Sequence, residues 1–336
     1  MTVALICLSV AAVIIAAVVS LKLELWGPSQ AVLERRYATS ASRFIDLAGT
    51  RLHYTDQGQP DGPAVVLLPA QWASFNLWKG WLPFLTDRYR VLCVDLPGHG
   101  LTGPMAMGDY SMEAYEHLLR LFVTSIELDR FFLVGSSFSG VIAFRYAAKP
   151  GHRLQGLVLA CSSGMPRAAN APQKPNEPPP QFLYRALMPY YRLRGFMSWK
   201  LSTLIIDPAR ITPGLIDEFT DFNNRKGRLR EAQLRSAAYS IGDPKAVLAR
   251  IQVPTLIQWP TGSTYLSTHE ADLFEEWLGS TVKHKIIYPN TGHLLALDAP
   301  TKTGQDARRF FDMCLAMPGN GGHPTLAFGA NDLAQR

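Results

Sequence analysis

Cysteine is scarce in this 336-residue chain, and basic charge is never clustered. The four cysteines stand at no spacing that suggests a metal site or a disulfide framework, so buried thiols are the better interpretation. The 33 lysines and arginines outnumber the 27 acidic residues, but they form no stripe of the kind that binds nucleic acid. No internal repeat is present. The sequence therefore implies no metal, no organic cofactor and no nucleic-acid partner.

The first segment has no charged residue at all. TVALICLSVAAVIIAAVVSL covers residues 2–21, and about twenty apolar residues in a helix span the hydrocarbon core of a bilayer. Trp26, just beyond the run, suits the membrane interface. A cleaved signal peptide is the competing interpretation, but no basic stretch precedes the run and the run is longer than a usual signal core. The pattern favours a membrane protein with a retained single-pass anchor in residues 1–25.

The charges that flank this segment bear on the side of the membrane. Lys22, Arg35, Arg36 and Arg43 follow the apolar run, and only the terminal amine precedes it. The positive-inside rule then favours a cytoplasmic folded domain. A short uncharged tail can also stay inside, so the side of the membrane remains open.

Short apolar runs alternate with amphipathic ones after this segment. Residues 44–47 and 51–55 look like a hairpin. Six further runs are typical of buried strands, over residues 64–68, 90–94, 131–134, 157–160, 255–258 and 285–288. Helical patterns cover residues 75–85, 112–126, 138–148, 270–278 and 301–313. This alternation predicts an α/β fold with a mostly parallel sheet that has helices on both faces.

One interval, residues 163–243, interrupts the alternation. It begins with the proline-rich stretch MPRAANAPQKPNEPPP and continues as aromatic and basic helical sequence. An insertion of this size predicts a helical cap over the carboxyl edge of the sheet, although a surface elaboration without a role in binding is the alternative. The core is thereby divided into residues 42–162 and 244–316. Residues 317–336 show no periodicity and are expected to form a flexible tail.

A strand, a turn of small residues and a helix follow one another in FLVGSSFSGVIA, residues 132–143. In the pattern G-x-S-x-G, such a turn holds a serine on a strained corner where its hydroxyl stands clear of the backbone. Gly135, Ser137 and Ser139 occupy the fixed positions, with Ser139 in place of the second glycine. Glycine-bearing turns are common between strands and helices, so a purely structural turn is the alternative to a nucleophile at Ser137.

The chain from about residue 42 to 315 resembles the α/β-hydrolase fold, with its eight-stranded sheet, and especially bacterial membrane-anchored serine hydrolases. The resemblance rests on the serine turn, on HYTDQG, on DLPGHGLTGP at residues 95–104 and on YPNTGH ending at His293. It implies acyl transfer in which Ser137 attacks a carbonyl and His293 takes and returns its proton. A cap between the sixth and seventh core strands is also implied, at residues 163–243. Its aromatic residues suggest either a roof over a small apolar acyl substrate or the core of the cap itself: Phe182, Tyr184, Tyr190, Tyr191, Phe196 and Trp199.

Two departures from the family pattern concern the acid and the oxyanion hole. Ser263 stands where the family has Asp after the seventh strand, and the second acid location, ACSSG after the sixth strand, contains no carboxylate. LLPAQ replaces the usual LLHGF, so the resemblance assigns the oxyanion donors to the backbone N–H groups of Gln71 and Phe138. Alanine tolerates positive φ less readily than glycine, which puts the conformation of this loop in question.

The sequence therefore predicts a membrane-anchored serine hydrolase that cleaves ester or related acyl bonds through Ser137 and His293. Its activity is expected to be reduced, because a missing triad acid costs on the order of 10⁴ in rate. A serine at the apex argues against haloalkane dehalogenase and epoxide hydrolase chemistry, since those relatives carry Asp there. Two alternatives stay open: a hydrolase that recruits its acid from elsewhere, and a non-catalytic α/β-hydrolase-fold protein that binds a ligand or joins a membrane complex with an unknown partner.

Overall fold

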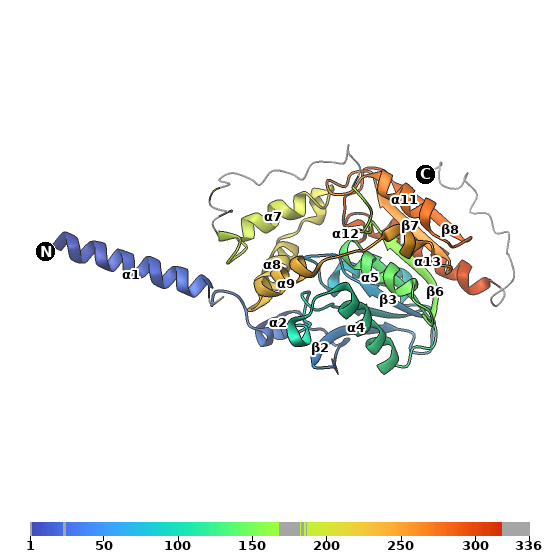
Figure 1. Cartoon of the computed structure of the whole chain (residues 1–336), viewed down its shortest axis with the longest axis horizontal. Coiled ribbons are helices and arrows are strands. Elements are labelled where there is room, and N and C mark those ends of the chain that lie inside the picture. The colour runs from blue at the N-terminus through green and yellow to red at the C-terminus, as the bar shows by residue number, and fades with distance from the viewer. Residues whose placement is uncertain (1, 23–24, 168–181, 183–184, 186, 318–336) are drawn as a thin grey trace.

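The computed structural model describes residues 2–22, 25–167, 182, 185 and 187–317. Most of the proline-rich stretch, Tyr184 and nearly all of the predicted tail lie outside these residues. Figure 1 shows one body of sheet and helices, with the first helix extending away from it.

An eight-stranded sheet forms the centre of the body, in the order β1-β2-β4-β3-β5-β6-β7-β8. β1 and β2 pair antiparallel, as do β2 and β4, and all other neighbours are parallel, which confirms the predicted hairpin and sheet. The strands are β1 (Ser42–Leu47), β2 (Thr50–Gly58), β3 (Ala64–Leu68), β4 (Arg90–Val94), β5 (Phe131–Ser136), β6 (Leu154–Ala160), β7 (Thr255–Pro260) and β8 (Lys283–Tyr288).

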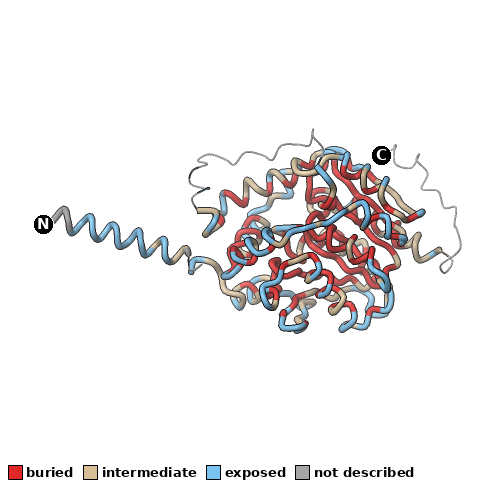
Figure 2. The backbone as a smooth tube through the Cα atoms, in the orientation of Figure 1, coloured by how far each residue is buried: buried red, intermediate tan, exposed pale blue. Residues whose placement is uncertain are grey.

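Helices cover both faces of the sheet, so its middle strands are inaccessible to solvent. Every residue of β3 and β5 is buried, as expected for parallel strands with both faces covered (Figure 2). The core helices are α2 (Gln30–Tyr37), α3 (Leu82–Leu85), α4 (Met112–Ser125), α5 (Phe138–Ala147), α10 (Pro244–Leu248), α11 (Thr268–Trp277), α12 (Leu295–Asp298) and α13 (Pro300–Ala316). Short 3₁₀ turns occupy η1 (Phe75–Trp78), η2 (Ala106–Gly108) and η3 (Pro208–Arg210).

The single helix predicted over residues 75–85 is wrong. The segment instead forms η1 and then α3, with a turn between them. Pro83 lies in the first turn of α3. A proline there lacks the N–H that a continuous helix would need from it, so it fits the start of a helix better than its interior.

The N-terminal segment does form a helix, α1 (Thr2–Lys22). Its described apolar side chains are exposed, among them Leu8 and Val13 at 68% each. The predicted transmembrane anchor is nevertheless not borne out, because no helix in the described part of the chain combines the length and the apolarity that a membrane crossing requires.

Three helices follow β6 in the interval that the sequence marks as an insertion: α7 (Arg194–Ser202), α8 (Pro213–Asn223) and α9 (Arg228–Ala238). We call them the inserted helices. Asn223 of α8 donates through its Nδ2 to the carbonyl of Trp72 (2.9 Å), and Ser74 donates its hydroxyl to Glu218 (2.6 Å). Because Trp72 and Ser74 follow β3, these bonds fasten α8 to the carboxyl edge of the sheet.

The DLPGHG loop after β4 is built around one buried carboxylate. Asp95 accepts the backbone N–H groups of Phe75 (2.7 Å) and Leu101 (2.8 Å), and its Oδ2 lies 2.8 Å from Nδ1 of His53. A Cβ on Gly100 would lie 2.1 Å from Asp95 Oδ2, which explains the glycine. The carboxylate therefore organises the loop.

Replacing Asp95 with Ala is expected to destabilise the protein by about 3 kcal/mol or more, because two buried N–H groups and the His53 ring lose their partner. Chemical denaturation with linear extrapolation measures this change. Asp129→Ala, an exposed site, is the control and should change the free energy of unfolding by less than about 0.5 kcal/mol. Equal stabilities of the two variants would show that the loop does not depend on the carboxylate.

Candidate active site

The serine turn between β5 and α5 has the strained geometry that its sequence predicts. Ser137 has φ 52° and ψ −114°, and α5 begins at the next residue. A Cβ on Gly135 would lie 2.7 Å from the Gly140 Cα, and a Cβ on Gly140 would lie 2.1 Å from the Ser162 Oγ. Only glycine fits these two positions, so the turn and the strand beside it fix the serine at the corner.

Ser139, which replaces the second glycine of the pattern, is used structurally. Its hydroxyl donates to the carbonyl of Leu68 (2.9 Å) and accepts the backbone N–H of Ser136 (2.9 Å). These bonds tie the serine turn to the end of β3. The substitution therefore strengthens the frame that holds Ser137.

The structure brings Ser137 and His293 together, although they lie far apart in the sequence. The Nε2 of His293 is 2.8 Å from the Oγ of Ser137, within hydrogen-bond distance. Both residues are buried: His293 is 5% exposed and Ser137 is 7% exposed. His293 follows β8, and Asp298 secures its loop by accepting the N–H groups of Gly292 and Asp207.

The two chain positions where the family can carry its acid, after β6 and after β7, both lie beside Nδ1 of His293. One presents a thiol there and the other a hydroxyl. The Nδ1 of His293 lies 3.1 Å from the Oγ of Ser263, after β7, and 3.3 Å from the Sγ of Cys161, after β6. Among the residues described, no carboxylate hydrogen-bonds this ring. Glu270 instead caps α11 through Ser267, so the structure offers no recruited acid.

Hydrogen bonds around Ser263 limit the tautomer of His293. The Ser263 Oγ accepts the backbone N–H groups of Tyr265 (3.2 Å) and Leu266 (3.1 Å), which occupy both of its lone pairs. Its own O–H must then donate. Donation to Nδ1 would leave the ring proton on Nε2, where the ring cannot take a proton from Ser137. If the hydroxyl turns away from the ring, Nδ1 can keep its proton and donate it to the Cys161 sulfur at 3.3 Å.

The site has an unusual charge balance. Burial of the ring, together with the positive charge of Lys200, lowers the pKa of His293 to about 4. Burial also raises the pKa of the Cys161 thiol, so the sulfur stays neutral. The imidazolium that acyl transfer requires therefore forms without a negative charge beside it and with a positive one nearby.

The oxyanion loop after β3 differs from what its sequence suggests. The residue at positive φ is Trp72, at 76°, and not Ala70. Ala73 N–H donates to the carbonyl of Ala70 (3.1 Å), so Gln71 and Trp72 form the corner of a turn. Phe138 is the first residue of α5, a position whose N–H has no partner within its own helix. The alanine is accommodated because the strained angle lies elsewhere.

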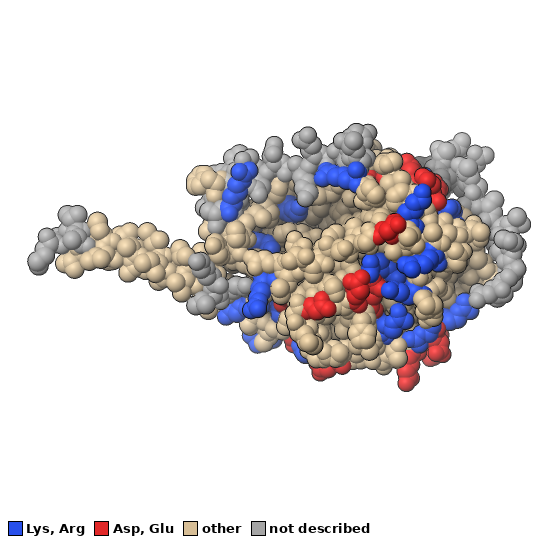
Figure 3. All heavy atoms as spheres, viewed as in Figure 1, with Lys and Arg blue, Asp and Glu red and all other residues tan. Residues whose placement is uncertain are grey.

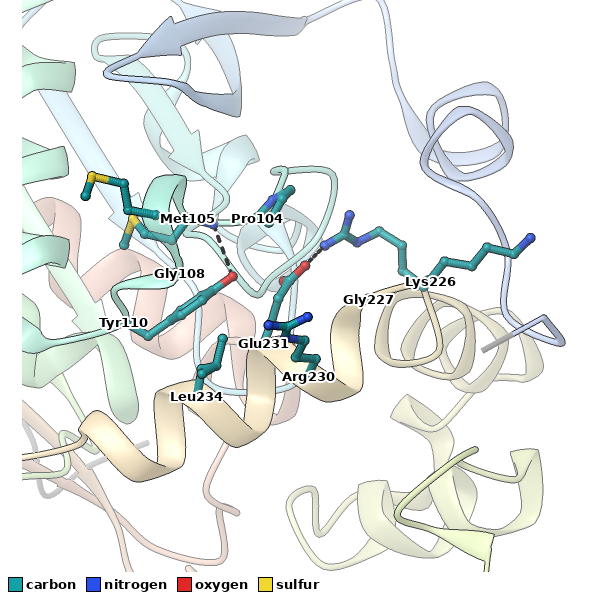
Figure 4. A pocket seen from close by; sticks show the side chains of 11 residues that line it. Pro104, Met105, Gly108, Tyr110, Lys226, Gly227, Arg230, Glu231 and Leu234 are labelled. Carbon is teal, nitrogen blue, oxygen red and sulfur yellow. Dashed lines mark hydrogen bonds and ion pairs between the residues drawn. The ribbon is translucent and has the colours of Figure 1, made fainter. Parts of the chain in front are cut away.

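A separate surface pocket of about 390 Å³ lies between the loop after β4 and α9 (Figure 4). Basic side chains of Arg225, Lys226 and Arg230 line part of it, and Glu231 pairs with Arg225. Neither Ser137 nor His293 lines this pocket.

A model of the alpha/beta hydrolase family matches residues 65–304. The chain belongs to the α/β-hydrolase family. Its relatives include monoacylglycerol lipase abhd6-B of Xenopus laevis, 28% identical over 81% of this chain and 82% of the relative. Monoacylglycerol lipase ABHD6 of Homo sapiens is 24% identical over the same shares.

Solved structures of this α/β-hydrolase's fold include a putative lipase from Acinetobacter baumannii, with a TM-score of 0.71 and 22% identity over 85% of this chain and 96% of that one. A membrane phospholipase A described as a bacterial virulence factor has a TM-score of 0.67 and 20% identity, over 94% of this chain and all of its own. At these identities the likeness shows the fold alone.

Sequence reasoning placed Ser137, His293 and Ser263 correctly relative to the strands, but it missed two neighbours of the imidazole. Cys161 had a signal, because it lies in ACSSG, the second acid location, where only a carboxylate was sought. Lys200 had none. It lies on α7, and nothing in the pattern of that helix shows which residue faces the base.

Proposed function

We propose that this hydrolase cleaves carboxylic esters of acyl lipids, with Ser137 as nucleophile and His293 as general base and then acid. The observation that carries the proposal is the 2.8 Å contact between Ser137 Oγ and His293 Nε2 at a strained serine turn. The names of the relatives, monoacylglycerol lipases, support an acyl glycerol as the substrate class.

The reaction follows from the positions of these atoms. Ser137 Oγ attacks the ester carbonyl carbon while its proton passes to His293 Nε2. The carbonyl oxygen becomes an oxyanion, which accepts the N–H groups of Phe138 and Gln71. The imidazolium returns the proton to the departing alkoxide as the C–O bond breaks. A water then repeats both steps on the acyl-enzyme, which releases the carboxylic acid and restores Ser137.

Cys161 acts in this scheme as a positioning residue. A general base must keep its proton on Nδ1 and leave Nε2 free, and Nδ1–H then needs an acceptor. Because both lone pairs of Ser263 are occupied by backbone N–H groups, the sulfur of Cys161 at 3.3 Å is the acceptor consistent with the working tautomer. Sulfur is a weak acceptor and carries no charge here, so the enzyme is slow compared with one that has a triad carboxylate.

The inserted helices support a cap role, and one of the aromatic residues predicted to form either a roof or a cap core, Phe196, favours the core. Phe196 is 3% exposed and packs 5.3 Å from the ring of Trp199, so it belongs to the core of these helices. Trp72, in the oxyanion loop itself, is partly exposed and offers apolar surface near Gln71. We infer that an acyl chain enters between this loop and the inserted helices.

Hydrolysis of a 1-acylglycerol tests the proposed function. We expect the wild-type protein to release fatty acid at least about tenfold faster than Ser137→Ala. Even without a triad acid, a serine nucleophile with a general base accelerates ester hydrolysis more than substrate binding alone does. Equal release by two folded proteins would favour the alternative of a non-catalytic binding protein, for which the missing carboxylate is the one supporting observation.

A further inference from the structure

Neutral groups hold the Lys200 ammonium in the neighbourhood of His293. Its Nζ donates to the hydroxyl of Tyr265 (2.5 Å) and lies 4.4 Å from the centre of that ring. The same Nζ lies 5.7 Å from the centre of the Trp72 ring. Within the described part of the chain, no carboxylate forms an ion pair with it. An ammonium that contacts a hydroxyl and two aromatic faces can still accept an anionic partner.

The two aromatic neighbours locate this ammonium within the reaction site. Trp72 directly follows Gln71 on the oxyanion loop, and the Tyr265 ring lies 5.5 Å from the imidazole of His293. Lys200 therefore lies between the loop after β3, which would receive the oxyanion, and Tyr265 of the loop after β7, whose ring packs near His293. In the space-filling view the surface is hollowed beneath α7, and lysine or arginine atoms are visible at the wall of the hollow (Figure 3).

Arg192 adds a second positive charge on the same side. Its guanidinium carbon lies 4.7 Å from the centre of the Trp72 ring, and its Nη1 donates to the carbonyl of Asn223 (2.7 Å). The Trp72 ring thus has two cations of the inserted segment near it, Arg192 and Lys200.

The missing acid and the extra cation both leave the His293 imidazolium without a negative charge to stabilise it. Acyl transfer turns His293 into an imidazolium, which a carboxylate normally stabilises. Here Ser263 and Cys161 supply no charge, and Lys200 opposes the imidazolium. An anion bound to the Lys200 ammonium would cancel its effect and bring a negative charge near the imidazolium, because Coulomb interactions in a buried site are weakly screened.

We propose that Lys200 binds an anionic group, a carboxylate or phosphate, carried by the ester substrate, and that the substrate thereby supplies the negative charge that Ser263 does not. The proposal rests on the hydrolase function proposed above and narrows its substrates to anionic acyl esters. Lys200 is then a specificity-determining residue.

Matched pairs of esters test this proposal. One pair is 1-acylglycerol and 1-acylglycerol 3-phosphate, and the other is 4-nitrophenyl valerate and mono(4-nitrophenyl) glutarate. We expect wild type to favour the anionic member of at least one pair by about tenfold or more in kcat/KM, and the pair that shows the preference identifies phosphate or carboxylate. Lys200→Met should abolish the preference, Lys200→Arg should retain part of it, and Lys302→Met, an exposed control, should leave it unchanged.

A pH profile separates this role from a structural one. Removing a positive charge near His293 raises its pKa, so the acid limb of kcat/KM for the neutral ester should move to higher pH in Lys200→Met. An unmoved limb, or a wild type that turns over both members of each pair equally, overturns the inference and leaves the proposed function standing. If Ser137 reacts with no ester and with no fluorophosphonate, the proposed function fails too.

Discussion

Replacing Ser263 with Asp is expected to raise kcat/KM for a neutral ester on the order of 10²-fold or more, toward the ~10⁴ that a triad carboxylate contributes. Ser263 Oγ already lies 3.1 Å from Nδ1 of His293. The backbone N–H groups of Tyr265 and Leu266, which now donate to the hydroxyl, can donate to a carboxylate at the same place. The new charge would fix the working tautomer and stabilise the imidazolium.

Ser263→Asn is the matched control for that gain. It has nearly the shape of the aspartate but no charge, so it should give no increase. Steady-state kinetics on the same ester, with circular dichroism to verify folding, measure both variants. A folded Ser263→Asp protein without any gain would mean that the loop after β7 does not aim its side chain at His293.

His293→Ala is expected to slow the reaction of Ser137 with a fluorophosphonate by about 10²- to 10⁴-fold, the usual contribution of a general base. This variant removes the Nε2 atom that lies 2.8 Å from Ser137 Oγ and that we propose as the proton acceptor. His117→Ala, an exposed change on α4, should react at the wild-type rate. Equal rates for all three proteins would show that His293 does not activate the serine.

The pH dependence of the same labelling reaction has a definite sign. A base works only when unprotonated, and burial with the charge of Lys200 lowers the pKa of His293 to about 4. Labelling of the wild type should therefore stay nearly constant between about pH 6 and 8 and fall only as the pH approaches 4.

The features that sequence predicted are those set by local pattern and chain order. The glycines around Ser137 are required by close backbone contacts, and such contacts leave a mark in the sequence. His293 was found because it follows the last strand, which parallel pairing brings beside the serine turn. Ser137 and His293 could both be located because each follows a strand of the buried parallel sheet, and such strands are recognisable as apolar runs.

The features that sequence missed depend on contacts between distant segments. Whether Cys161 accepts from Nδ1 depends on how the loops after β6, β7 and β8 meet, and whether Lys200 faces the base depends on how α7 rests on the core. Neither is a local property. The positive φ at Trp72 in place of Ala70 was likewise decided by a turn that α8 helps to hold.

Fluorophosphonate labelling followed by peptide mass spectrometry tests the central claim most directly. If Ser137 is a nucleophile activated by His293, the wild-type protein carries one phosphonyl adduct, on the peptide that contains Ser137, and Ser137→Ala carries none. A folded wild-type protein that gains no adduct, or that gains it with the same efficiency after Ser137→Ala, would contradict the account.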